Sequence, residues 1–342
     1  MSTDHSMAAS AAEQGRLRVL DGWRGISILL VLATHLLPLG PKGWQLNETT
    51  GPMGMALFFT LSGFLITRFL LTHDSIPDFL IRRFFRIVPL AWLALALALP
   101  LSGTAAADYL PNFLFYANLP PQHLTDIASH FWSLCVEIQF YVGIAIVVAV
   151  LGRRGLYLLP LVCVAVTLHR VAAGALVDIV TWRRVDEILA GGVLALIHSG
   201  QFGDRPKRLV AGLNAYVMFA LLAVASHPSS GFVNYLRPYI AAALVGTTLF
   251  DPPARLGMVL RSRTLRYIAT VSFALYVVHH LLMFTWLGEG DKWVKYLKRP
   301  LLFALTFALA HVSTFYYEQR WIEFGKRLSD KLTKRRAACA ES

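Results

Sequence analysis

A succession of long apolar segments, separated by short polar ones, constrains this chain more than any other feature. Of its 342 residues 56% are hydrophobic and only 15% are charged, whereas about a quarter of the residues in soluble domains are charged. Because a membrane-spanning helix needs about 20 mostly apolar residues, the pattern predicts an all-α, polytopic transmembrane helical bundle. Ten spans are predicted, at 23–39, 53–71, 87–101, 131–151, 156–172, 187–198, 209–225, 239–250, 267–284 and 301–317.

The positions of the basic residues predict how the bundle is oriented. With both termini in the cytoplasm, 23 of the 32 Lys and Arg residues fall in inside segments and 8 in outside loops, and Arg170 lies within a span. Lys and Arg are enriched in cytoplasmic loops, so the net charge of +12 reflects membrane orientation and not nucleic-acid binding. The predicted parts are a polar cytoplasmic segment at 1–16, a transmembrane domain at 17–325 and a basic cytoplasmic tail at 326–342.

Two ionisable residues in the first span predict a functional face. Arg24 and His35 are eleven positions apart, which places them within about 20° of each other around a helix and roughly 16 Å apart along its axis. Asp21 lies one turn before Arg24. Charged groups inside a membrane are costly and usually have a partner or a function, although Arg24 alone also fits an arginine reaching the membrane interface.

Polar residues also recur at helical spacing in the fourth and ninth predicted spans. Glu137 lies near the outside end of its span, where a carboxylate can orient a histidine. A shared central cavity would satisfy these polar faces, and it fits a transporter or an intramembrane enzyme. The structural alternatives are an ion pair of Glu137 with an arginine and, for the ninth span, helix–helix hydrogen bonding. The residues of the two faces are His130, Ser133, Glu137 and Tyr141, and Ser272, Tyr276 and His279.

Five ordered motifs carry a resemblance that covers nearly the whole chain. They are Leu-Asp-Gly-Trp-Arg-Gly at 20–25 followed by His35, the segment 54–66 with Ser62, the segment 82–89 with Arg82, Arg83 and Arg86, the segment 130–137 with His130, Trp132, Ser133 and Glu137, and the segment 272–279 with Tyr276 and His279. Together they resemble the acyltransferase 3 family of bacterial membrane O-acyltransferases. The resemblance implies a multi-pass protein of the inner (cytoplasmic) membrane and maps the family's essential arginine and histidine onto Arg24 and His35.

The implied reaction is acyl transfer from cytoplasmic acyl-CoA, commonly acetyl-CoA, to a hydroxyl group. The acceptor classes are a carbohydrate, a glycolipid or a small molecule; no permanently bound cofactor and no metal are expected. His35 is expected to act as general base or as a covalent acyl relay, and Glu137 to orient it. The arginines at 82, 83 and 86 are expected to bind the phosphates of CoA, or else only to anchor the helix on the cytoplasmic side.

The remaining candidates are assigned supporting or substrate-binding roles. They are Asp21, Ser62, His130, Trp132, Ser133, Tyr276 and His279. Ser62 and the following glycine are expected to let two helices approach closely. The alternatives are a transporter or flippase that uses the same polar path, in which histidines would relay protons, and a membrane scaffold without catalytic activity.

Overall fold

A computed structural model describes residues 2–73 and 75–341, and every element in that part of the chain is helical, as predicted. The longer helices are α1 (Ser2–Leu36), α2 (Leu46–Thr72), α3 (Ile76–Leu101), α5 (Trp132–Leu151), α6 (Leu159–Ala172), α7 (Asp186–His198), α9 (Ala215–Ser226), α10 (Arg237–Phe250), α12 (Arg263–Met283), α13 (Lys292–Val312) and α14 (Gln319–Glu341). The shorter helices are η1 (Lys42–Trp44), α4 (Ala106–Phe113), η2 (Asp126–Phe131), η3 (Gly152–Leu158), η4 (Thr181–Arg183), α8 (Asp204–Ala211), η5 (Pro228–Leu236), α11 (Ala254–Leu260) and the π-helix η6 (Ser313–Glu318).

Six helical runs are long and apolar enough to cross a membrane, and a seventh is reached if the bent pair α8 and α9, which meet at 83°, counts as one span. The six are Arg18–Leu36, Lys42–Thr72, Ile76–Leu101, Asp126–Ala172, Arg263–Met283 and Lys292–Thr333. The run from Asp126 holds both the fourth and the fifth predicted spans. The sixth and eighth correspond to α7 and α10, which have only 13 and 14 residues, fewer than a full span needs. The count of ten therefore stays a prediction.

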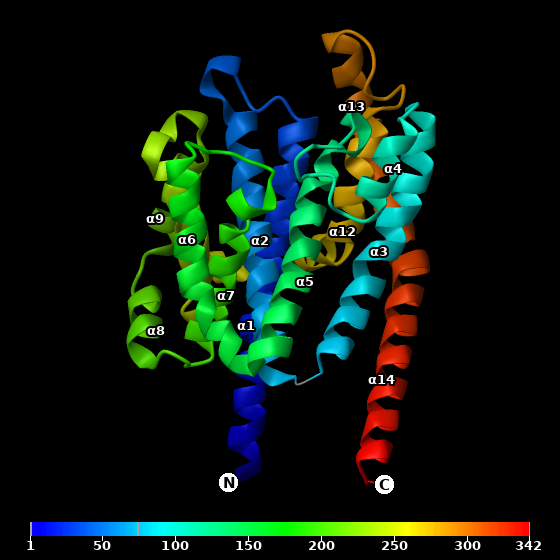
Figure 1. Cartoon of the computed structure of the whole chain (residues 1–342). Helices are drawn as coiled ribbons and strands as arrows, with labels where there is room; N and C mark the ends of the chain where they lie inside the picture. The colour runs from blue at the N-terminus through cyan, green and yellow to red at the C-terminus, as the bar shows by residue number, and fades with distance from the viewer. Residues whose placement is uncertain (1, 74, 342) are drawn as a thin grey trace. The chain divides into compact units, whose positions relative to one another are not determined.

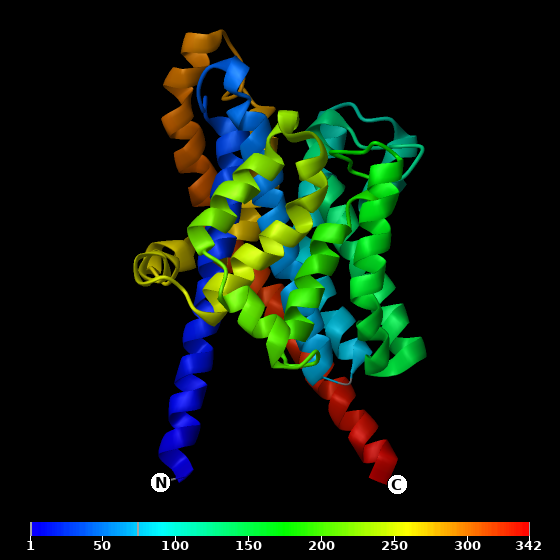
Figure 2. The ribbon, with the colours of Figure 1, turned by 90° about the vertical axis from the view of Figure 1, so that its left-hand side faces the viewer.

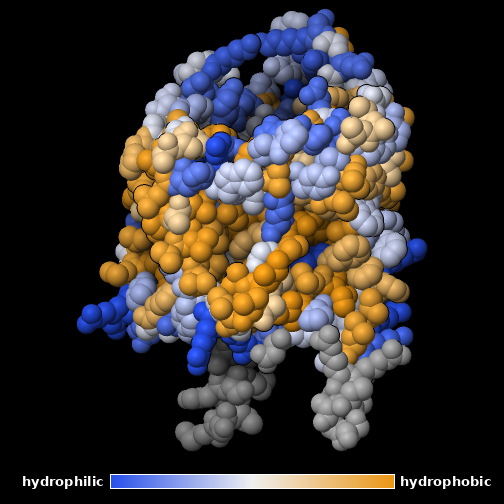
Figure 3. Space-filling view, in the orientation of Figure 1, coloured by the Kyte–Doolittle hydropathy of each residue, from blue (hydrophilic) through white to orange (hydrophobic). Residues whose placement is uncertain are grey.

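Large apolar side chains line the exposed faces of several helices at a spacing of four residues. On α13 the exposed fractions are 83% for Leu297, 45% for Leu301, 37% for Leu305 and 45% for Leu309; on α5 they are 50% for Val142, 57% for Ile146 and 75% for Val150. Figure 3 shows apolar side chains over the visible faces of the helices and hydrophilic ones toward their ends. Such stripes would be costly in water and are favourable against lipid, which supports a multi-pass membrane protein.

The helices form two compact units that alternate along the chain. Unit 1 contains Met1–Arg68, Tyr157–Asp178 and Arg183–Ser272; unit 2 contains Phe69–Leu156, Ile179–Trp182 and Phe273–Ser342. Both α2 and α12 cross from one unit into the other, so each supplies side chains to both. The contacts of the candidate residues are therefore described within each unit separately.

Unit 1 is held together by close helix contacts and by a buried tryptophan. A Cβ atom added to Gly63 of α2 would lie 1.8 Å from the carbonyl oxygen of Ile188 in α7, and one added to Gly191 would lie 2.0 Å from that of Thr60. Only glycine permits this approach, which confirms the predicted role of the segment around Ser62 in close packing. Trp23 of α1 is fully buried, and its indole nitrogen donates to Thr248 Oγ1 of α10 at 2.7 Å.

In unit 2, α14 packs along α3 (Figure 1). A Cβ atom added to Gly325 would lie 2.6 Å from Cβ of Phe85, and the rings of Phe85 and Trp321 stack with their centroids 6.0 Å apart. The hydroxyl of Tyr317, in the π-helix, donates to the carbonyl of Pro89 at 3.3 Å. That carbonyl lies within the proline-containing helix α3. These contacts fix the face of α3 that carries Arg82 and Arg86.

Candidate functional site

The catalytic pair predicted on the first span lies on one continuous helix of unit 1. α1 runs without a break from Ser2 to Leu36 (Figure 2), so the eleven-residue spacing of Arg24 and His35 places both side chains on one face. Both are half-buried, as is Asp21 one turn before Arg24. Between Arg24 and His35 the helix is mostly apolar, with Ile28, Val31 and Leu32 buried, and the two hydroxyl side chains of this stretch donate to backbone carbonyls of the same helix. The geometry required by the predicted stripe is therefore present.

Asn47 holds the turn of α1 that carries His35. Its amide nitrogen donates to the carbonyls of Thr34 at 2.8 Å and Leu37 at 2.7 Å, and its Oδ1 accepts from the backbone N–H of Leu39 at 3.3 Å. The last four carbonyls of a helix have no partner within the helix. From the start of α2, Asn47 supplies a donor to one of them, that of Thr34, and a second donor to the carbonyl of Leu37 just beyond the helix end. Sequence reasoning missed this residue, because only a long-range contact reveals its role.

A hydrogen-bonded cluster joins α12 to the start of α5 in unit 2. The Tyr276 hydroxyl donates to the carbonyl of His130. The Ser133 hydroxyl oxygen lies 2.5 Å from the Tyr276 hydroxyl oxygen. The imidazole ring of His130 lies 5.4 Å from the Tyr276 ring and 5.7 Å from that of His279, between centroids. The structure thus brings together four of the predicted residues, and all four are buried or nearly so.

Two neighbouring histidines in this cluster have defined hydrogen bonds. Nδ1 of His279 lies 3.1 Å from the carbonyl of Leu275, and Nε2 of His280 lies 3.1 Å from the carbonyl of Asp126. A carbonyl can only accept, so each of these nitrogens carries a proton, and in the neutral ring the other nitrogen is an acceptor. His280 also lies with its ring centroid 4.5 Å from that of His130. No role for His280 follows from the sequence alone.

Two further predicted residues, Trp132 and Glu137, lie in the first two turns of α5. Glu137 is 5% exposed, and its Oε1 accepts a hydrogen bond from the Tyr141 hydroxyl one turn later. This bond joins two residues of the predicted polar face that are one helical turn apart. Trp132 is half-buried at the first position of the helix.

The three arginines of α3 have different surroundings. Arg82 donates to Asp78 at 2.7 Å and to Asp330 at 3.1 Å, and the guanidinium of Arg86 lies 3.8 Å from Glu318. Arg83 has no carboxylate partner among the described residues. The sequence grouped the three as equivalent phosphate ligands, but in the structure Arg82 and Arg86 have carboxylates within 4 Å and Arg83 has none among the described residues.

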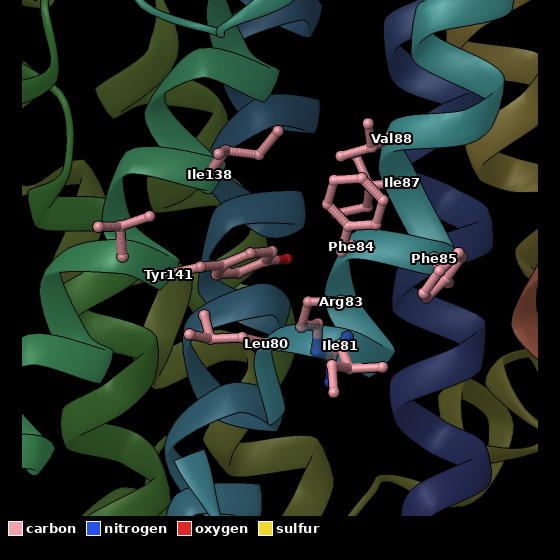
Figure 4. Close-up of a pocket in the computed structure, with 10 residues that line it drawn as sticks. Leu80, Ile81, Arg83, Phe84, Phe85, Ile87, Val88, Ile138 and Tyr141 are labelled. Carbon is pink, nitrogen blue, oxygen red and sulfur yellow. The ribbon is translucent and has the colours of Figure 1, made fainter. Parts of the chain in front are cut away.

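Arg83 instead lines an apolar groove between α3 and α5, with a volume of about 360 Å³. Its guanidinium carbon lies 5.9 Å from the centroid of the Tyr141 ring, a cation–π contact. Figure 4 shows Tyr141 extending from α5 toward the α3 side chains, with Arg83 beside it. Most of the other lining residues are apolar, and Phe84 and Val142 are 43% and 50% exposed. Arg83 is therefore the charged side chain among the lining residues of an otherwise mostly apolar groove.

Comparison with known proteins gives evidence about the family of this chain that is independent of the geometry. A family model described as an acyltransferase domain matches residues 17–318, which is most of the chain. The chain belongs to this acyltransferase family. The match begins just before the α1 face with Arg24 and includes every predicted site residue.

The relatives that match are longer proteins. The peptidoglycan O-acetyltransferase OatA of Listeria monocytogenes is 25% identical over 309 residues, which cover 76% of this chain and 48% of that protein. YrhL of Bacillus subtilis, named as a candidate peptidoglycan O-acetyltransferase, is 25% identical over 323 residues with the same coverage. A candidate O-acetyltransferase of Staphylococcus aureus is 31% identical over 159 residues, covering 39% of this chain and 24% of that protein. The chain thus spans about half the length of the first two relatives, and no solved structure matches it.

Proposed function

We propose that the chain is a membrane O-acetyltransferase that moves an acetyl group from acetyl-CoA to a hydroxyl group of a carbohydrate acceptor. The observation that carries the proposal is the family match over 17–318 together with Arg24 and His35 on one face of the unbroken helix α1. The names of the relatives favour a cell-wall glycan such as peptidoglycan as acceptor class, and they do not favour the transporter alternative.

The proposed topology places both termini in the cytoplasm and the chain in the cytoplasmic membrane. It is supported by the excess of basic residues in the segments that this orientation puts inside. In this arrangement the short helices α7 and α10 complete the ten spans as shortened crossings. Arg24 then lies toward the cytoplasmic end of α1 and His35 toward the opposite end, so that a donor from one side can meet an acceptor from the other.

The donor end of the proposal rests on the α3 arginines. Arg83 lines the groove without a carboxylate partner among the described residues, whereas Arg82 and Arg86 are paired with carboxylates. A guanidinium recognises phosphate through charge-assisted hydrogen bonds. We therefore assign the leading contact with the CoA phosphates to Arg83, with Arg82 and Arg86 shaping the helix face around it.

The proposed chemistry uses His35 as the general base. Its imidazole takes the proton of the acceptor hydroxyl while the hydroxyl oxygen forms a bond to the thioester carbonyl carbon. The carbon–sulfur bond then breaks, and the imidazolium returns the proton to the departing CoA thiolate. Arg24 supplies a cation on the same helix face. A covalent acyl–imidazole relay is the second form of this proposal, and the orienting role assigned to Glu137 stays a prediction.

The test is transfer of labelled acetyl from acetyl-CoA in membranes that contain the His35→Ala variant. Loss of general-base catalysis lowers the rate by about 10²–10⁴-fold. The matched control is His311→Ala, because His311 is an exposed histidine on α13. Transfer at the unmodified rate by well-expressed His35→Ala would remove His35 from the mechanism, and equal loss in both variants would show a folding defect.

A further inference from the structure

Five charged side chains are buried together at adjoining helix ends of unit 1. Arg170 lies in the last turn of α6, Arg184 precedes α7, Asp186 and Glu187 begin α7, and Arg237 begins α10. Four of them are 0% exposed and Arg184 is 1% exposed. A buried charge is tolerated when it is paired and its hydrogen-bonding groups are satisfied. The partners of each guanidinium therefore show whether the cluster is complete.

Arg170 is complete. Its Nη1 donates to Asp186 Oδ2 at 2.5 Å, and its Nη2 donates to the carbonyl of Leu176 at 2.9 Å and to Asn234 Oδ1 at 3.3 Å. The guanidinium carbon also lies 5.5 Å from the centroid of the Tyr235 ring. One guanidinium is thus matched by one carboxylate, and this half of the cluster is neutral.

Arg237 is not complete. Its Nε donates to Glu187 Oε1 at 2.7 Å, while Glu187 Oε2 lies 3.3 Å from Nη2 of Arg184. Two guanidiniums share one carboxylate, so this triad carries a net charge of +1. Burial lowers the pKa of Arg184 to about 10, which still leaves it protonated at neutral pH. Nη1 and Nη2 of Arg237 are buried and have no hydrogen-bond partner among the described residues.

The helix that begins at Arg237 adds to the positive potential. An α-helix carries about half a positive charge at its N-terminus. α10 is 14 residues long and has no acidic residue in its first turn, whereas α7 begins with Asp186 and Glu187. Arg237 is the first residue of α10, so the field of this helix start adds to the positive potential around its side chain.

We propose that Nη1 and Nη2 of Arg237 bind a small monovalent inorganic anion, such as chloride, which neutralises the triad of Arg184, Glu187 and Arg237. The planar fork of a guanidinium suits such two-point binding. The exposure of 0% for Arg237 and Glu187 excludes a sugar polymer or a nucleotide as the ligand. This site is independent of the acetyl transfer proposed above, and its role is to complete the charge balance of unit 1.

The test compares the thermal unfolding midpoint of the purified full chain in sodium chloride, sodium bromide and sodium gluconate at equal ionic strength. An anion that binds only the folded state raises the midpoint as its concentration exceeds the dissociation constant. We expect higher midpoints in chloride and bromide than in gluconate. Arg237→Gln removes this difference, and Glu187→Gln, which raises the net charge of the triad, makes the response appear at lower chloride concentration.

Two further variants keep the test decisive. Arg205→Gln, an exposed arginine in α8, keeps the full chloride response. Arg237→Lys keeps the charge but loses the fork, and we expect it to need at least tenfold more chloride. If Arg237→Gln does not fold, bromide anomalous scattering from crystals of the unmodified chain replaces it, with a peak expected beside Arg237. Three results would overturn the proposal: equal midpoints in chloride and gluconate, a chloride response that survives in Arg237→Gln, or no bromide peak beside Arg237. Each would mean that the Nη groups of Arg237 hold only water or an adventitious ion.

Discussion

The buried polar groups of the two units differ in kind. Unit 1 buries formal charges, in the cluster around Arg170, Asp186 and Glu187. Unit 2 buries imidazole, phenol and hydroxyl groups, in the cluster around His130 and Tyr276. Guanidinium and carboxylate groups stay charged near neutral pH, while histidine as a residue type exchanges protons there. The comparison indicates that the first cluster fixes structure and that the second has groups suited to proton transfer.

The largest effect is expected from Asp186→Asn. This change leaves the guanidinium of Arg170 buried without its carboxylate, which costs about 3–5 kcal/mol of unfolding free energy. Denaturation in detergent measures it. The control is Glu323→Gln, because Glu323 pairs with Arg327 while 66% exposed, and exposed pairs contribute at most about 1 kcal/mol. Equal losses would contradict the structural role of the buried pair.

The next effect is expected from Tyr276→Phe in unit 2. Without its hydroxyl, the carbonyl of His130 and the Ser133 hydroxyl lose their shared partner. We expect acetyl transfer to fall by about 100-fold, because the position of the His130 ring is no longer fixed, with a stability loss of about 1–3 kcal/mol. Transfer and unfolding are measured on the same preparation. A stability loss with unchanged transfer would make this cluster structural, like that of unit 1.

Asn47→Ala tests whether an uncharged side chain of unit 1, the amide of Asn47, contributes to acetyl transfer. Removing its amide leaves the carbonyls of Thr34 and Leu37 without these donors and loosens the turn that carries His35. We expect kcat to fall about tenfold, or about 1.4 kcal/mol, with KM for acetyl-CoA unchanged. Asn214→Ala, which removes the N-cap of α9, is the control and affects stability only. A matching fall in kcat in both variants would assign Asn47 to general stability.

The smallest effect is expected at the groove of unit 2. Arg83→Gln removes the arginine that lines it, and KM for acetyl-CoA is expected to rise several-fold, by about 1 kcal/mol, with kcat retained. Arg82→Gln changes KM less, because Arg82 is engaged by Asp78 and Asp330. Steady-state kinetics over a range of acetyl-CoA concentrations separates the two. A larger rise in KM for Arg82→Gln than for Arg83→Gln would assign the leading contact with the CoA phosphates to Arg82.

The sequence is enough to predict which residues share one face of a single helix. The spacing of Arg24 and His35, and that of Glu137 and Tyr141, follows from helical geometry once the segment is known to be helical. The close packing at Gly63 was also predictable from the small residues beside it. The number of spans does not follow from the sequence in the same way, because α7 and α10 are apolar yet short, and apolar composition alone does not fix where a helix ends.

Contacts between distant segments could not be predicted. Arg82 has a carboxylate one turn away in α3, Asp78, which its spacing already suggests. Only the fold brings the carboxylates of α14 and of the π-helix to Arg82 and Arg86, and leaves Arg83 without a carboxylate partner among the described residues. Asn47 looks like an ordinary loop residue until its amide is seen at the end of α1. Arg170 and Arg237 are 67 positions apart, and two carboxylates that lie between them in the sequence join them into one cluster.

By itself the sequence determined that this protein is an all-helical membrane protein with the motifs of an acyltransferase, because hydrophobicity and helical spacing are local properties of the chain. Only the tertiary structure decided which polar groups are satisfied and which are not. Hydrogen bonds and ion pairs act over about 3–4 Å, so whether a guanidinium has a partner depends on residues that folding brings together from distant segments.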